Sequence, residues 1–254
     1  MGISHSRTLR CEKLNKCFDG VTALQAFTLA LPRCGIVAII GPNGAGKTTL
    51  LNVVTGFLRP DSGLCLLDDR DITRAPPHRI VRMGLARTFQ DLRLIRLISV
   101  LENVMLARPN QRGDKLWAAL TRTGVRNEER RNQQNAMRLL DFVGLAGKAE
   151  EPAGELSYGE QKLLTLACCL ATEARILLLD EPIAGVHPEL ARQILGLLEN
   201  LRDSGKLIVF IEHDLAAVRE IADRVIVMDE GRIIADGSPS DVLNRPEIME
   251  AYVA

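Results

Sequence analysis

Several features that would point to particular classes of protein are missing from this sequence. Its 32 lysines and arginines balance 32 aspartates and glutamates, so bulk charge gives no indication of a nucleic-acid partner. The six cysteines are scattered without a CxxC pair or a nearby histidine cluster, which argues against a zinc site or a disulfide framework and favours a reducing cytosol. Ser4 to Arg10 is polar and basic, so we expect no secretory signal. The longest apolar run, Leu163 to Ala171, is far shorter than the ~20 residues of a membrane-spanning helix, and we expect none.

The hydrophobic content and the alternation of strand and helix patterns predict an α/β protein. With 254 residues, of which 46% are hydrophobic, the chain can bury the core of one large domain or of a domain with a subdomain. Apolar blocks and turn signals predict strands at residues 9–14, 27–31, 36–40, 64–67, 85–89, 176–179, 207–211, 225–228 and 232–235. Helical patterns follow residue 49 and cover 77–83, 99–107, 127–142, 157–172 and 188–203, with a last helix after Ser238. We predict one domain over residues 1–254. In it, residues 1–93 and 155–254 form an α/β core with a small antiparallel β subdomain, and residues 94–154 form an inserted helical subdomain.

The most informative segment is a glycine-rich loop between a buried strand and a helix. It fits the pattern GxxxxGKT and consists of Gly41, Pro42, Asn43, Gly44, Ala45, Gly46, Lys47, Thr48 and Thr49. Such a loop closes backbone N–H groups around phosphate oxygens, and the helix N-terminus adds partial positive charge. Lys47 would reach the β- and γ-phosphates, and the Thr48 hydroxyl would bind Mg²⁺. The chain is therefore predicted to bind a nucleoside triphosphate.

Two carboxylates follow the apolar strand at residues 176–179. Asp180, at the strand tip, can hold Mg²⁺ directly or through water. Glu181 is then placed to activate an attacking water as a general base. A solvated strand end that leads into Pro182 would look similar, but the phosphate loop earlier in the chain favours the catalytic interpretation.

Two further polar residues stand at strand ends. His213 follows the buried strand at residues 207–211, where ligands of open α/β sheets bind, and it could hydrogen-bond a γ-phosphate. A lone histidine is usually structural or solvated, so this residue alone leaves both interpretations open. Gln90 follows the strand that begins at Leu85 and by itself indicates little.

Together these residues resemble the ATP-binding cassette of ABC transporters over nearly the full chain. The resemblance is carried by Phe18, Gly41 to Thr49, Gln90, Leu156-Ser157-Tyr158-Gly159-Glu160, Asp180-Glu181 and His213. It implies the fold of a P-loop NTPase core of ABC type, with ATP and Mg²⁺ as cofactors. It also implies that Glu181 is the catalytic base, that His213 is the switch histidine, and that Lys47 contributes to catalysis.

The resemblance implies roles for other positions too. Phe18 would stack on adenine, and Gln90 would link Mg²⁺ and water to the transporter interface. Ser157 and Gly159, with Glu160 beside them, would contact the γ-phosphate bound by an opposing subunit. The helical subdomain would face the permease, so Trp117 in the polar segment 108–126 is either an interface anchor or a residue of that subdomain's own core.

A narrower resemblance is to the ATPase subunits of branched-chain amino-acid importers. It rests on residues 87–90, 156–159, 182–186 and 246–252. Tyr158 and Glu160 depart from the usual LSGGQ signature, although Tyr158 is common in this branch. Glu160 can close a capping box with Ser157 but adds negative charge near a phosphate. His187 stands where the family usually has Asp, which puts signalling between subunits in doubt.

The expected function is that of an ATP-hydrolysing importer subunit for branched-chain or related amino acids. Its partners would be a second ATPase subunit, integral-membrane permeases and, indirectly, a solute-binding protein. It would lie at the cytoplasmic face of the cell membrane as a peripheral protein. Urea or short-amide import and lipopolysaccharide export stay open as alternatives. A soluble cassette ATPase acting on ribosomes or DNA usually has two cassettes or a long coiled-coil insertion, and this sequence shows neither. A non-hydrolysing ATP-binding module commonly lacks the carboxylate of Glu181, so the presence of Glu181 argues against that class.

Overall fold

The computed structural model describes residues 9–88, 92–109, 125–246 and 248. The chain forms two compact units. The core unit comprises residues 1–87, 175–184 and 198–254, and the helical unit comprises residues 88–174 and 185–197. The predicted subdomain boundaries at residues 94 and 154 stay a prediction.

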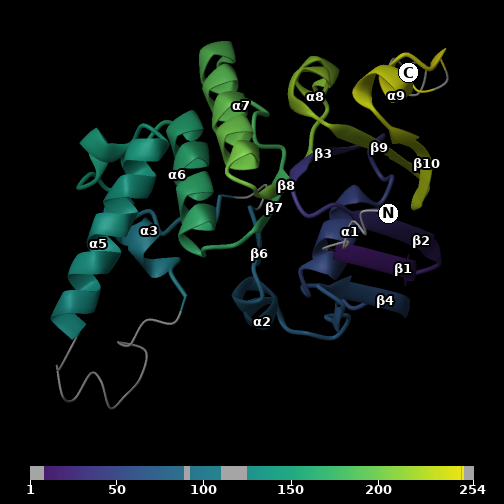
Figure 1. The fold of residues 1–254 in the computed structure, drawn as a ribbon, viewed down its shortest axis with the longest axis horizontal. Helices are drawn as coiled ribbons and strands as arrows, with labels where there is room; N and C mark the ends of the chain where they lie inside the picture. Colours follow the sequence, from purple (N-terminus) through teal and green to yellow (C-terminus); the bar gives the residue numbers. More distant parts are fainter. Residues whose placement is uncertain (1–8, 89–91, 110–124, 247, 249–254) are drawn as a thin grey trace, which may run out of the picture. The chain divides into compact units, whose positions relative to one another are not determined.

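The core unit contains a six-stranded sheet in the order β10-β9-β3-β8-β7-β6 (Figure 1). Its strands are β3 (Gly35–Ile40), β6 (Leu85–Arg87), β7 (Ile176–Asp180), β8 (Leu207–Ile211), β9 (Arg224–Asp229) and β10 (Arg232–Gly237). All neighbours pair in parallel except β9 and β10. Every residue of β7 and β8 is buried, as continuous apolar runs predict for strands covered on both faces. The parallel pairing brings the carboxyl ends of β3, β7 and β8 to the same edge of the sheet.

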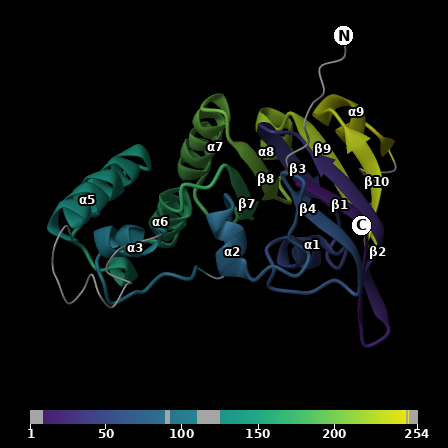
Figure 2. The ribbon, with the colours of Figure 1, turned by 60° about the horizontal axis from the view of Figure 1, so that its bottom comes forward.

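A second, antiparallel sheet has the order β2-β1-β4-β5. Its strands are β1 (Leu9–Phe18), β2 (Val21–Leu31), β4 (Ser62–Leu67) and β5 (Arg70–Asp71). Helix α1 (Lys47–Val54) lies next to this sheet (Figures 1 and 2). One hydrophobic cluster joins both sheets and α1, and includes Leu14, Phe27, Val37, Leu50 and Ile226. The predicted α/β core with a small antiparallel sheet is confirmed.

The described part of the core unit also contains the short helices α2 (Pro77–Arg82), α8 (Leu215–Ile221) and α9 (Pro239–Leu243). Ser238 caps α9 as predicted, because its side chain accepts the N–H of Asp241. Helix α8 and strand β5 were not predicted. Asp214 begins α8 by accepting the N–H groups of Ala216 and Ala217. The strand expected at 85–89 ends at Arg87: Thr88 lies outside it, and residue 89 is outside the described residues.

The helical unit is built from α3 (Val100–Leu106), α5 (Val125–Phe142) and α6 (Tyr158–Ala171), which contact one another. Two short 3₁₀ helices, η2 (Ala146–Lys148) and η3 (Ala153–Glu155), join α5 to α6. The predicted capping box of α3 is present, with Ser99 and Glu102 each accepting the backbone N–H of the other. Helix α7 (Pro188–Asp203) contributes residues to both units. In the described part of the chain, none of the helices has the length and apolar character needed to span a membrane.

Candidate active site

The glycine-rich loop joins β3 to α1 in a conformation that excludes larger residues. Gly41 and Gly46 have φ angles of 151° and 95°. A Cβ atom on Gly41 would lie 2.1 Å from the carbonyl oxygen of Met228, and one on Gly46 would lie 2.2 Å from that of Ala23. The loop is therefore held against the end of β9 and the beginning of β2, and both contacts need the missing side chains.

The loop also leaves donors available at the start of α1. Gly46 precedes the helix and has no side chain with which to cap its first N–H groups, and the first turn contains no acidic residue. Asn43, Gly44 and Thr48 are exposed, whereas Ala45 is buried and Thr49 is half-buried. Backbone donors and an exposed hydroxyl at a helix N-terminus are a suitable environment for phosphate oxygens.

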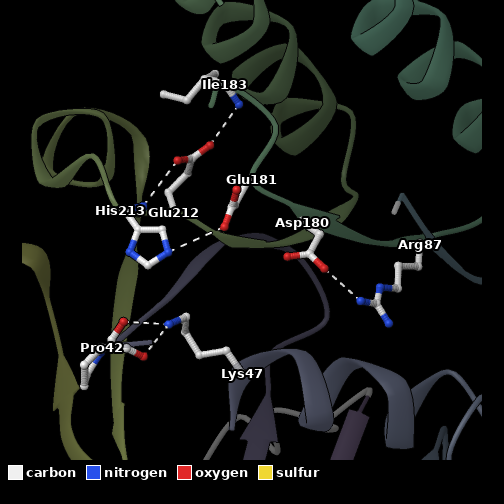
Figure 3. Close-up of polar contacts among 9 residues, drawn as sticks. Pro42, Lys47, Arg87, Asp180, Glu181, Ile183, Glu212 and His213 are labelled. Atoms are coloured by element: carbon white, nitrogen blue, oxygen red, sulfur yellow. Dashed lines mark hydrogen bonds and ion pairs between the residues drawn. The ribbon is translucent and has the colours of Figure 1, made fainter. Parts of the chain in front are cut away.

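Lys47 folds back over this loop (Figure 3). Its Nζ donates to the carbonyl oxygens of Gly41 and Pro42, at 2.6 and 2.8 Å. An ammonium has three donors, so these bonds leave one for a ligand. Burial lowers the pKa of Lys47, and the negative charges of Glu181 and Asp180 oppose that shift. Lys47 therefore lies within electrostatic reach of both carboxylates at the end of β7.

Asp180, the last residue of β7, is fixed by contacts that the sequence did not reveal. Its Oδ2 accepts a hydrogen bond from Arg87 Nη2 at 2.8 Å, and the side chains of both residues are only 4% exposed (Figure 3). Arg87 Nη1 also donates to Asn52 Oδ1 at 2.6 Å. Arg87 belongs to β6, beside β7, and Asn52 belongs to α1. The guanidinium thus ties the predicted metal ligand to the helix that follows the phosphate loop.

Glu181 and His213 face each other across the ends of β7 and β8. Glu181 Oε1 lies 3.5 Å from His213 Nε2, and the two side chains are 23% and 43% exposed (Figure 3). This distance is too long for a good hydrogen bond, but a water or a phosphate oxygen could contact both groups. Glu181 has a positive φ of 50°, and its N–H donates to the carbonyl of Ile211 at 3.0 Å.

Glu212, which the sequence analysis did not single out, is the most buried carboxylate at this edge. It is 2% exposed, and its Oε1 accepts the backbone N–H of Ile183 at 2.8 Å. Its Oε2 accepts the N–H of His213 at 3.3 Å (Figure 3). An acidic residue next to a strand-end histidine was visible in the sequence, but its burial and its partner in another loop were not.

Phe18 ends β1 with an accessible ring. The residue is 43% exposed, and Lys16 Nζ lies 5.3 Å from the centre of its ring. Asp61 accepts from Lys16 at 2.6 Å and from the N–H of Cys17 at 2.7 Å, and these bonds lower the pKa of Asp61. The end of β1 is therefore held in place while the ring stays available for stacking.

The segment 156–160 belongs to the helical unit. Ser157 caps α6, and a capping box with Glu160 is present. Glu160 Oε1 also pairs with Lys148 Nζ at 2.8 Å, and the hydrogen bond between these charged groups lowers the pKa of Glu160 and raises the pKa of Lys148. The negative charge that Glu160 adds to the signature is thus balanced within the same unit. Gly159 is buried at the start of the helix.

The structure says little about the predicted roles of His187, Gln90 and Trp117. His187 is exposed immediately before α7, and its carbonyl accepts the N–H of Ala191 at 3.0 Å. Gln90 and Trp117 lie outside the described residues.

The residues that are described offer a limited set of metal ligands. Among them, no cluster of three or more His, Cys, Asp or Glu side chains could hold a metal ion. Thr48 and Asp180 supply one hydroxyl and one carboxylate. Such a set fits Mg²⁺, which proteins usually bind through one or two side chains together with phosphate oxygens and water.

Comparisons with known proteins agree with this geometry. Residues 24–184 match the family model described as ABC transporter. The chain is 37% identical to the probable branched-chain amino acid transport ATP-binding protein LivG of Archaeoglobus fulgidus, with 97% of this chain and 95% of that protein covered. It is 38% identical to the high-affinity branched-chain amino acid transport ATP-binding protein LivG of Escherichia coli, with 93% of each covered.

A solved structure of an ATP-binding cassette from an ABC transporter, MJ1267 in its ADP conformation, superposes with a TM-score of 0.84. It is 34% identical in sequence, and the match covers 98% of this chain and 99% of that one. The predicted fold and the predicted resemblance are both confirmed. This chain belongs to the ABC transporter family, as an ATP-binding and ATP-hydrolysing cassette.

Proposed function

We propose that this cassette powers the uptake of branched-chain amino acids through partner permeases. The observation that carries the proposal is the identity of 37–38%, over more than nine-tenths of the chain, to subunits named for that transport. The phosphate loop, with the Asp180, Glu181 and His213 side chains at the same sheet edge, supports the hydrolytic part.

In the proposed reaction, ATP lies on the loop 41–49. The first N–H groups of α1 and the Lys47 ammonium bind its β- and γ-phosphates. Glu181 orients the attacking water and accepts its proton, while His213 donates a hydrogen bond to the γ-phosphate. Lys47 stabilises the negative charge that develops on the transferred phosphoryl group, and its burial strengthens that effect.

The adenine and the metal involve other side chains. Phe18 stacks on adenine, which its exposed ring supports. Thr48, Asp180 and Gln90 would hold Mg²⁺ together with phosphate oxygens, and the bound ion would supply further neutralisation of phosphate charge.

The working assembly pairs two ATPase chains on two permeases. Ser157, Gly159 and Glu160 of one chain contact the γ-phosphate that the other chain binds. Residues 94–154 form a helical subdomain that faces the permeases, and a solute-binding protein acts on the complex indirectly. The chain is then a peripheral protein at the cytoplasmic face of the membrane.

Reconstitution in proteoliposomes tests this proposal. The chain is combined with candidate permease subunits for branched-chain amino acids, and ATP hydrolysis is measured with a candidate solute-binding protein loaded with leucine, isoleucine or valine. We expect stimulation by these ligands and none with Glu181→Gln as the control. Stimulation by urea or a short amide instead, with no response to branched-chain amino acids, would overturn the substrate assignment and leave the ATPase assignment intact.

A further inference from the structure

Glu212 contacts the backbone on both sides of the Glu181 and His213 pair. It directly follows β8 and precedes His213, whose N–H it accepts at 3.3 Å. Its other oxygen accepts the N–H of Ile183 at 2.8 Å, in the loop that follows Glu181. One buried carboxylate therefore joins the two segments that carry the facing side chains (Figure 3).

The loop after Glu181 needs such support because its backbone is strained. Glu181 has a φ of 50°, in the left-handed region that is unfavourable for a residue other than glycine. The N–H of Glu181 bonds to Ile211, and its carbonyl accepts the N–H of Ala184 at 3.3 Å. The bond from Ile183 to Glu212 ties the middle of this turn to the neighbouring strand end.

We propose that Glu212 is a positioning residue that keeps Glu181 and His213 at their working separation during ATP hydrolysis. The inference rests on the proposed roles of Glu181 and His213, and it concerns how they are held. The two hydrogen bonds of Glu212 hold the backbone of Ile183 and of His213, so we expect it to affect the placement of Glu181 and His213 more than the affinity for the nucleotide. Its effect falls on the turnover step, where a displacement of about 1 Å can cost up to about 10²-fold in rate.

The charge and shape of Glu212 both matter to this role. A carboxylate has acceptors only, so both oxygens can face N–H groups without conflict. A glutamine at this position keeps one acceptor but places an amide donor against one of the two N–H groups. An alanine leaves the buried N–H of Ile183 without its acceptor, which is costly in a dry environment.

The test compares steady-state ATP hydrolysis of the full chain with that of Glu212→Ala and Glu212→Gln. We expect Glu212→Ala to lower kcat by about 10–10²-fold and Glu212→Gln to lower it less, with the KM for ATP within about twofold of wild type. Combining Glu212→Ala with Glu181→Gln should lower kcat by less than the product of the two single losses, because Glu181→Gln already removes the part of the effect that acts through Glu181. A residue that served stability alone would lower the melting temperature and show no such non-additivity.

Asp223→Asn is the matched control. Asp223 Oδ2 also accepts a backbone N–H in the core unit, from Ile36 at 2.8 Å, but near the amino end of β3 and away from Glu181. We expect it to leave kcat nearly unchanged. Wild-type kcat in Glu212→Ala, or multiplicative losses in the double variant, would overturn the inference, and so would failure of both Glu212 variants to fold. An inactive wild-type chain would instead contradict the proposed function.

Discussion

Replacing Arg87 by methionine should destabilise the core unit strongly, because the change removes the guanidinium from a buried carboxylate. Arg87 Nη2 lies 2.8 Å from Asp180 Oδ2, and both side chains are 4% exposed. Methionine keeps much of the length of the side chain, so the loss comes mainly from the charge that Asp180 retains. Removing one partner of a buried ion pair costs about 3–5 kcal/mol. Each kcal/mol lowers the Tm of a chain of this size by roughly 2–4 °C, so a decrease of roughly 6–20 °C is expected.

Urea denaturation followed by circular dichroism measures this free energy directly. Arg175→Met is the control, because the Arg175–Asp68 pair has side chains that are 52% and 39% exposed, and such pairs contribute less than about 1 kcal/mol. Adding Asp180→Asn to Arg87→Met should recover part of the loss, since it removes the charge left behind. The reasoning is refuted if Arg87→Met and Arg175→Met lower stability equally.

Four further predictions concern the nucleotide, the subunit contact and the ion pair between Lys148 and Glu160. Glu181→Gln should keep ATP binding and lower turnover by roughly 10²–10⁴-fold, and near-normal hydrolysis would contradict its role as the base. Phe18→Ala should weaken ATP binding by about 1–2 kcal/mol in calorimetry, whereas unchanged affinity with a lower Tm would make Phe18 a core residue. His187→Asp should change the Hill coefficient of hydrolysis or its pH profile, and identical values would leave His187 a helix cap. Lys148→Met should lower the free energy of unfolding at pH values where Glu160 is ionised, and the difference from wild type should disappear as pH falls through the lowered pKa of Glu160. A difference between the two proteins that persists in acid would exclude the ion pair as its cause.

Much of the fold follows from local sequence patterns. Helix α7 begins and ends at the predicted residues, and the capping box at Ser99 is present, because each depends on residues within a few positions of one another. The continuous apolar runs of β7 and β8 likewise predicted strands buried on both faces. Asp214, followed by Leu215 and two alanines, is also a local N-cap signal for α8.

Contacts that support the site could not be predicted in the same way. Arg87 and Asp180 are 93 positions apart, and they meet only because β6 lies beside β7 in the sheet. Glu212 and Ile183 are 29 positions apart, in loops whose course depends on the pairing of β7 with β8. Strand order and loop direction are tertiary properties, so a motif can locate the reacting groups while the residues that hold them stay hidden.

The positive φ of Glu181 is not explained by the backbone of its turn and points to a role of its side chain. Asp19, Asp68 and Glu230 also have positive φ angles, but they lie in hairpin turns where such angles are usual. Glu181 instead follows a buried parallel strand, where a glycine would adopt the same backbone at lower cost. Glycine would leave intact the three hydrogen bonds that the N–H groups of residues 181, 183 and 184 donate, since none of these bonds uses the Glu181 side chain. The backbone of this turn therefore does not require glutamate at this position, and the carboxylate that faces His213 gives the residue a role in the site.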